Sequence, residues 1–121
     1  MASATVPPIR SLLRECCAVP ASVPLPAETA EALAQKFKAL GDPARVQLLS
    51  LIAAAPEGEA CICDLTEPVG LSQPTVSHHM RLLADAGLVT REQRGRWAFY
   101  RPVNAELTAL GEAVAQLTQT P

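Results

Sequence analysis

The sequence of 121 residues lacks long hydrophobic runs and contains few aromatic or charged residues. No stretch approaches the roughly 18 consecutive apolar residues of a membrane helix, which excludes a membrane-spanning protein. Arg10 and Arg14 lie near the N-terminus, but no apolar run follows them, so we expect no secretory signal and a cytoplasmic location. The short chain also argues against a large enzyme.

Apolar residues nevertheless make up 49% of the chain, which is enough for one hydrophobic core. Seven of the eleven prolines lie before residue 57. Residues 1–26 are rich in Pro, Ala, Ser and Val, and we interpret them as an N-terminal arm with a short helix at 9–16. Residues 27–118 are expected to form the folded domain.

The chain as a whole has no excess of positive charge, since its formal net charge is −2. The charge is unevenly distributed, however. Residues 1–70 hold five basic and eight acidic residues (net −3), residues 71–101 hold five and two (net +3), and residues 102–121 hold two acids. Because attraction to phosphates depends on the contacting face, the basic segment 71–101 favours nucleic-acid binding.

Two helices are predicted before residue 57. In residues 27–40, Leu33, Phe37 and Leu40 recur at helical spacing on one face, and a glycine follows as a stop signal. Asp42-Pro43 then has the residues of a helix start, because Asp is a good N-cap and Pro suits the first helical position. One side of this second helix is expected to contain the apolar residues Val46, Leu49 and Ile52, widened by Leu48 and Leu51.

The rest of the sequence has the pattern of a helix-turn-helix followed by a wing. Ser72 as N-cap, Pro74 in the first turn and Gly87 after the last turn delimit a helix at 73–86. The predicted fold is therefore mainly α with a small β-hairpin, a winged helix-turn-helix. The other expected elements are a short segment at 61–69, a turn at 70–72, strands at 88–92 and 97–103 around a hairpin turn at 93–96, and an apolar-faced helix at 104–118.

The helix at 73–86 has one apolar and one polar face when its residues are placed at about 100° intervals. Val76, Met80, Leu83 and Ala84 group on the apolar face, which leaves His79 beside the core in a packing role. The N-terminal half of the polar face is the part of such a helix that reads base edges. The expected base-reading residues are Gln73, Thr75, Ser77 and His78, and Arg81 is expected to contact phosphate.

The predicted wing contains Arg94 and Arg96 on either side of Gly95. Arginines on a narrow hairpin suit the minor groove and its phosphates. Trp97, Phe99 and Tyr100 are expected to pack within the hairpin. The alternative for the whole unit is a winged helix that contacts another protein.

Four cysteines occur in two pairs, Cys16-Cys17 and Cys61-Ile62-Cys63. Residues i and i+2 of one helix point about 200° apart and cannot share an ion, so we expect Cys61 to precede a helix that Cys63 opens. Thiolates select soft ions: three suit arsenite or antimonite, and four suit cadmium, lead or zinc. The alternative is that these cysteines are small buried hydrophobic residues.

Four segments of the sequence closely resemble the ArsR/SmtB family of bacterial metalloregulatory repressors. These segments are 37–45 (FKALGDPAR), 61–65 (CICDL), 71–80 (LSQPTVSHHM) and 85–89 (DAGLV), and the resemblance spans about residues 27–118. It implies a homodimer, paired through the first and last helices, that binds double-stranded operator DNA and is released from it by an inducer. The two reading helices would then meet successive major grooves about 34 Å apart.

The same resemblance implies that Cys61 and Cys63 belong to a thiolate inducer box. Cadmium- and lead-sensing members join arm cysteines to this box across subunits, whereas some arsenite sensors use an adjacent arm pair and a third cysteine. We favour As(III) or Sb(III) bound by Cys16, Cys17 and one of Cys61 or Cys63, with Cd(II) or Pb(II) as the alternative.

Other functions are also compatible with the sequence. The same repressor could sense oxidants or persulfides by forming a disulfide. A thiol-rich metal-buffering protein without a DNA role is the alternative from another class, but it leaves the polar face of the 73–86 helix unexplained. An enzyme is not expected, because no substrate pocket or basic partner is suggested near the cysteines.

Overall fold

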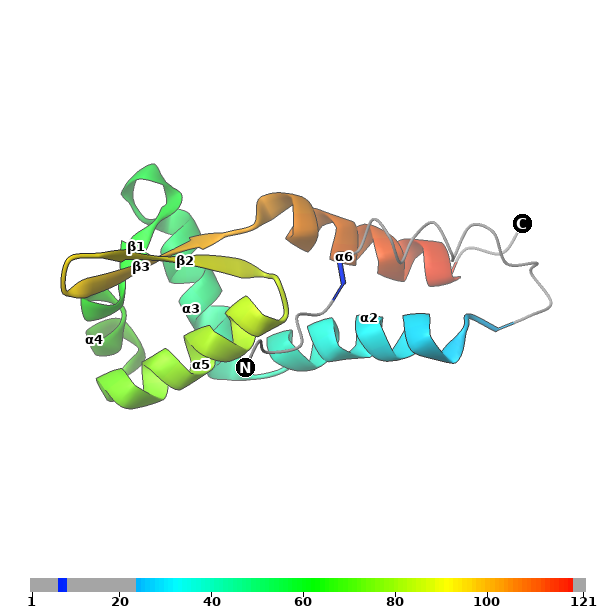
Figure 1. Ribbon diagram of the computed structural model, residues 1–121, viewed down its shortest axis with the longest axis horizontal. Helices are drawn as coiled ribbons and strands as arrows, with labels where there is room; N and C mark the ends of the chain where they lie inside the picture. Colours follow the sequence, from blue (N-terminus) through cyan, green and yellow to red (C-terminus); the bar gives the residue numbers. More distant parts are fainter. Residues whose placement is uncertain (1–6, 9–23, 119–121) are drawn as a thin grey trace.

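The computed structural model describes residues 7–8 and 24–118. The expected arm helix at 9–16, with Cys16 and Cys17, lies outside the described residues. The elements, drawn in Figure 1, are α2 (Ala27–Leu40), α3 (Pro43–Ala54), the 3-10 helix η1 (Pro56–Gly58), β1 (Ala60–Cys61), the 3-10 helix η2 (Ile62–Asp64), α4 (Thr66–Val69), α5 (Gln73–Asp85), β2 (Val89–Arg94), β3 (Trp97–Pro102) and α6 (Asn104–Thr118).

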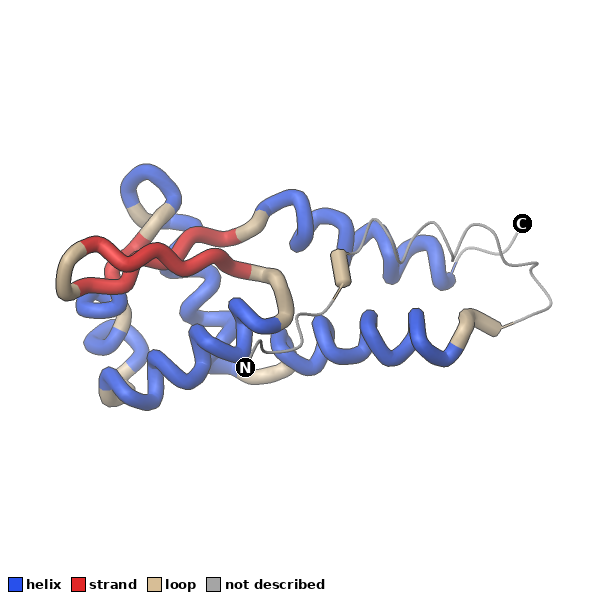
Figure 2. Tube along the Cα trace, viewed as in Figure 1, coloured by secondary structure: helices blue, strands red, loops and turns tan. Residues whose placement is uncertain are grey.

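The strands form a small antiparallel sheet at one end of the molecule, away from the far ends of α2 and α6 (Figure 2). The strand order is β1-β3-β2. The predicted hairpin of β2 and β3 is confirmed, but its turn contains only Gly95 and Arg96, so β2 extends two residues further toward the tip than expected, whereas β3 begins at Trp97 as predicted. β1 was not predicted as a strand, because two residues are too few to show an alternating pattern; it pairs Cys61 with Phe99 of β3.

Local capping interactions place the helix boundaries where the sequence predicted them. The Asp42 carboxylate accepts a hydrogen bond of 2.8 Å from the Ala44 amide at the start of α3. Ser72 Oγ accepts one from the Thr75 amide at the start of α5. Gly87 adopts φ +81° just after α5, the left-handed conformation that ends helices.

The core lies where α2, α3, α5 and the sheet meet, and Leu48, Ile52, Met80 and Leu83 have no exposed surface there. The predicted buried side of α2 is wrong at Phe37, which is 36% exposed. Its neighbour Lys36 is buried instead. The cause is a tertiary contact described below, which the apolar spacing does not reveal.

The predicted side of α3 also needs a correction, because Val46 is 54% exposed while Leu48 and Ile52 are fully buried. α3 is apolar around most of its circumference, so its spacing does not select one face. Within residues 7–8 and 24–118, no helix is long and apolar enough to cross a bilayer.

We predict that Gly87→Ala lowers the free energy of unfolding by about 1–2 kcal/mol, because an alanine is strained at positive φ. Its Cβ would also lie 3.4 Å from Lys36 Nζ. Gly111→Ala, in α6, is the control: its Cβ would meet no neighbour, and it should stabilise the protein by about 0.5–1 kcal/mol. Urea unfolding of both variants checks this, and equal effects would contradict the assigned conformation of Gly87.

Candidate DNA-binding interface and thiol pair

Helix α5 is fixed in rotation by its apolar stripe. Val76, Met80 and Leu83 are fully buried, as the sequence predicted. The opposite face therefore points outward, and Gln73 and His78 are exposed on it. A helix held in this way presents an invariant polar surface, which is what reading base edges requires.

An open groove of about 520 Å³ lies between the polar face of α5 and the β2–β3 hairpin. It combines hydrogen-bonding side chains from the helix with cationic side chains from both elements. Besides Tyr100, its polar lining consists of Gln73, Ser77, His78, Arg81, Asp85, Arg91, Gln93 and Arg96. Five of these eight residues were predicted to contact DNA, and Asp85 is the acidic one among them.

Arg91 is the cationic residue of the groove lining that was not predicted from the sequence. Strand alternation places Arg91 and Gln93 on one face of β2, and both line the groove. Applying this alternation to the basic strand would have identified Arg91. Thr75 is exposed on α5 and its hydroxyl lies 2.9 Å from Ser72 Oγ, so it takes part in the helix cap.

Arg94 lies on the other face of the hairpin. Its guanidinium donates hydrogen bonds to Glu59 (2.7 and 3.1 Å) and Glu92 (2.9 Å), and its centre lies 4.4 Å from the Phe99 ring centroid. Arg101 Nη2 lies 3.5 Å from Glu59. The structure therefore does not bring Arg94 into the groove, and its contact with DNA stays a prediction.

The hydrogen bonds from Arg94 hold the pKa values of Glu59 and Glu92 below the ordinary carboxyl range. Both groups are therefore charged at neutral and mildly acidic pH. Their contribution to stability is present above the unfolded-state pKa and is lost as the pH falls through the lowered folded-state pKa. This ion-pair network joins the residue before β1 to the wing.

His79 packs as predicted rather than facing the groove. It is half-buried, and its Nδ1 lies 3.0 Å from Arg45 Nη1 on α3. Arg45 also donates a hydrogen bond to the Ala39 carbonyl at the end of α2. The pair therefore ties α5 to the α2–α3 corner.

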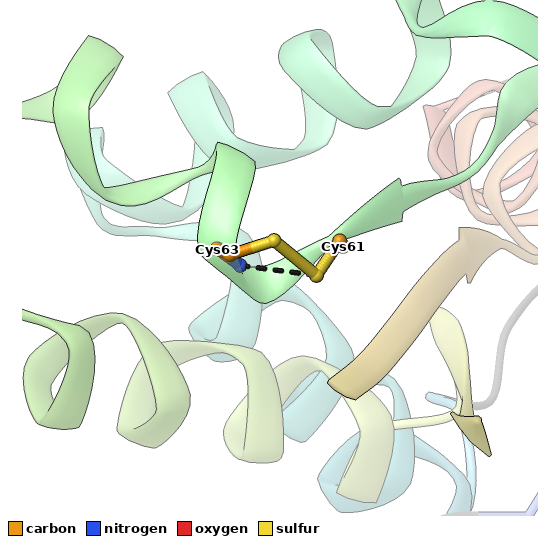
Figure 3. Close-up of a disulfide and its surroundings, with 2 residues drawn as sticks. All are labelled: Cys61 and Cys63. Atoms are coloured by element: carbon orange, nitrogen blue, oxygen red, sulfur yellow. Dashed lines mark hydrogen bonds between the residues drawn. A yellow bond between two sulfur atoms is a disulfide. The ribbon is translucent and has the colours of Figure 1, made fainter. Parts of the chain in front are cut away.

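Cys61 and Cys63 lie at the junction of β1 and η2, and their sulfur atoms form a disulfide (Figure 3). Cys61 ends the strand and is buried, whereas Cys63 lies within the 3-10 turn and is exposed. The Cys63 amide also donates a hydrogen bond of 3.3 Å to Cys61 Sγ. The expectation that Cys61 precedes the helical turn is confirmed, and this offset brings both sulfurs to one side.

The segment that contains Cys61 and Cys63 contacts both elements that form the groove. Cys61 pairs with Phe99 of the wing strand β3. Ile62, between the two cysteines, is buried and lines the groove beside Gln73 and Ser77. The backbone around the cysteines is therefore in contact with both the wing strand β3 and helix α5.

The donor set fits a soft ion only in part. In their reduced form, two adjacent thiols provide two ligands of the type that thiophilic ions prefer. Among residues 7–8 and 24–118, no cluster of three His, Cys, Asp or Glu side chains could hold a metal ion. A three-thiolate site thus requires a donor from outside the described residues or from a second copy of the chain.

The fold and the basic groove define a winged helix-turn-helix protein of the DNA-binding class. Residues 42–91 match the model of a bacterial regulatory protein family, the arsR family. Over 76 residues the chain is 38% identical to the arsenical resistance operon repressor of Bacillus subtilis. The matched region covers 63% of this chain and 70% of that protein.

Solved structures agree with this assignment. The crystal structure of an ArsR family transcriptional regulator has a TM-score of 0.64 at 25% identity, covering 75% of this chain and 96% of the other. The solution structure of a homodimeric winged helix-turn-helix domain from Mycobacterium bovis has a TM-score of 0.55 at 31% identity, covering 69% and 77%. The chain belongs to the arsR family, and is a DNA-binding transcriptional regulator rather than an enzyme.

We predict that Arg91→Ala weakens DNA binding and reduces the slope of log K against log salt by about 0.9, the value for one lost phosphate contact. Arg94→Ala removes the same charge from the other face of the hairpin and should reduce the slope less, because the hydrogen bonds from Arg94 to Glu59 and Glu92 compete with a phosphate contact. Fluorescence anisotropy on a labelled promoter fragment at several salt concentrations measures both. Equal slope changes in the two variants would show that the two faces of the hairpin do not differ in their DNA contacts.

Proposed function

We propose that this protein is a dimeric transcriptional repressor that releases its operator when a trivalent metalloid, As(III) or Sb(III), binds cysteine thiolates. The observation that carries the proposal is the pair Cys61–Cys63, which lies in a segment that contacts both the wing strand β3 and helix α5. The similarity to an arsenical resistance operon repressor supports the choice of inducer. Such a regulator acts on DNA in the cytoplasm.

The proposed dimer pairs α2 and α6 of two copies. Both helices extend away from the wing, toward the opposite end of the molecule (Figure 1). They carry the exposed apolar side chains Phe37, Val114 and Leu117, which pairing would remove from water. The homodimeric relative from Mycobacterium bovis supports this arrangement. Two α5 helices would then enter successive major grooves about 34 Å apart.

In this proposal the reduced Cys61 and Cys63 thiolates provide two of the inducer's three ligands. Their side-by-side sulfurs favour the use of both, rather than of only one as the sequence suggested. The third ligand is Cys16 or Cys17 from the arm formed by residues 1–26. Binding of Cd(II) or Pb(II) by four thiolates is the competing form of the same mechanism.

Release of the operator follows from the position of the thiol pair. An inducer that ties the arm to Cys61 and Cys63 pulls on β1 and η2, which contact β3 and α5. A shift of either element changes the groove that faces the DNA. A coupling free energy of about 1–3 kcal/mol would weaken DNA binding roughly 5- to 150-fold.

The disulfide itself favours a second candidate input, oxidation. The two thiols would give up two electrons and two protons to a hydroperoxide, which is reduced to an alcohol and water as the sulfur–sulfur bond forms. The exposed Cys63 would meet the oxidant and the buried Cys61 would close the bond. A dithiol reductant would then restore operator binding, whereas a metalloid response requires the reduced protein from the outset.

We predict that Cys61→Ser/Cys63→Ser keeps wild-type affinity for the operator but is no longer released by arsenite, because the substitution removes two ligands and no DNA contact. Cys16→Ser/Cys17→Ser should have the same phenotype, since the third thiolate is lost. Gel-shift titrations with arsenite and with cadmium, under reductant, measure release.

The matched comparison separates the alternatives. Normal arsenite release by the Cys16→Ser/Cys17→Ser variant would exclude the arm from the site. Release of the wild type by cadmium and not by arsenite would contradict the metalloid assignment. Metal binding by a protein without preference for its own promoter fragment would support a metal-buffering role instead.

A further inference from the structure

A fully buried lysine links three helices, α2, α5 and α6, whose relative orientation matters for the proposed mechanism. The side chain of Lys36, on α2, has no exposed surface. Its Nζ donates a hydrogen bond of 2.7 Å to the Ala86 carbonyl and lies 3.1 Å from Glu106 Oε1 on α6. One ammonium group thus joins α2, α6 and the C-terminal end of α5.

The acceptor of this hydrogen bond is a backbone carbonyl at the C-terminal end of α5. Ala86 is the C-cap residue, and its carbonyl lies beyond the last helical turn, where it has no partner within the helix. A cation at this end also interacts favourably with the helix dipole. Lys36 therefore holds α5 at the end opposite to Gln73, where base reading is expected.

Stability alone does not explain this lysine. Burying an ammonium group is costly, and replacing a buried ion pair with apolar side chains of similar volume is often neutral or stabilising. The surroundings pack closely around the ammonium group: Gly87 lies next to Nζ, and the side chain of its partner Glu106 is only 14% exposed. What the contacts of Lys36 with Ala86 and Glu106 do provide is a defined position for α5.

We propose that Lys36 is a positioning residue that sets the orientation of α5 relative to α2 and α6, and thereby the spacing between the two reading helices of the dimer. This inference rests on the proposed DNA reading by α5 and the proposed pairing through α2 and α6. From Gln73 to Ala86 the helix is about 20 Å long. A tilt of about 3° at Ala86 therefore displaces the base-reading end by about 1 Å.

The test compares Lys36→Met with Lys38→Met, which removes the same charge from an exposed position of the same helix. Full-length reduced protein is titrated onto the operator that the wild type protects in its own promoter, and onto the same operator with one base pair inserted between the half-sites. The wild type and Lys38→Met are expected to prefer the native spacing. Lys36→Met is expected to bind the native operator about 5- to 150-fold more weakly and to lose this preference.

A second variant guards against misfolding. Lys36→Met/Glu106→Leu replaces the pair with apolar side chains, so it should keep the thermal unfolding temperature and the dimer mass in sedimentation, yet still lose the spacing preference. If the double variant keeps both wild-type operator affinity and spacing preference, the positioning role is refuted. A wild type that does not bind its promoter as a dimer would instead refute the proposed function.

Discussion

The complete burial of the α5 stripe formed by Val76, Met80 and Leu83 is the constraint on which the rest of the structure depends. A reading helix that rotated by one position would present different side chains to the DNA. The stripe prevents this rotation, because turning the helix would expose apolar surface and bury its polar face. The core thus decides which residues face outward, and the groove between α5 and the hairpin exists as a consequence.

Fixing the rotation of a helix about its axis does not fix its tilt. Different contacts hold the two ends of α5. At the N-terminal end, Ser72 caps the helix, and the η2 turn that contains the buried Ile62 contacts α5. At the C-terminal end, Lys36 Nζ donates a hydrogen bond to the Ala86 carbonyl. The first contact lies beside Cys61 and Cys63 and the second beside the helices of the proposed dimer, so the proposed inducer binding and subunit pairing would both act on α5.

Boundaries and the winged helix-turn-helix were predictable because their signals are local. Asp42, Ser72 and Gly87 each specify a cap within a few residues of themselves. What the sequence did not reveal depends on partners far along the chain. The burial of Lys36 requires an acceptor 50 residues away, and the engagement of Arg94 requires Glu59, 35 residues before it. Periodicity describes one element at a time and contains no such information.

The central claim is that a metalloid bound by thiolates releases the regulator from its DNA. Its most direct test is the fluorescence anisotropy of a labelled promoter fragment bound by the full-length protein, kept reduced and titrated with arsenite. The account predicts a return to the anisotropy of free DNA near one arsenite per chain. Unchanged anisotropy at saturating arsenite, with release on adding a hydroperoxide and rebinding on adding a dithiol, would contradict it and identify Cys61 and Cys63 as a redox pair.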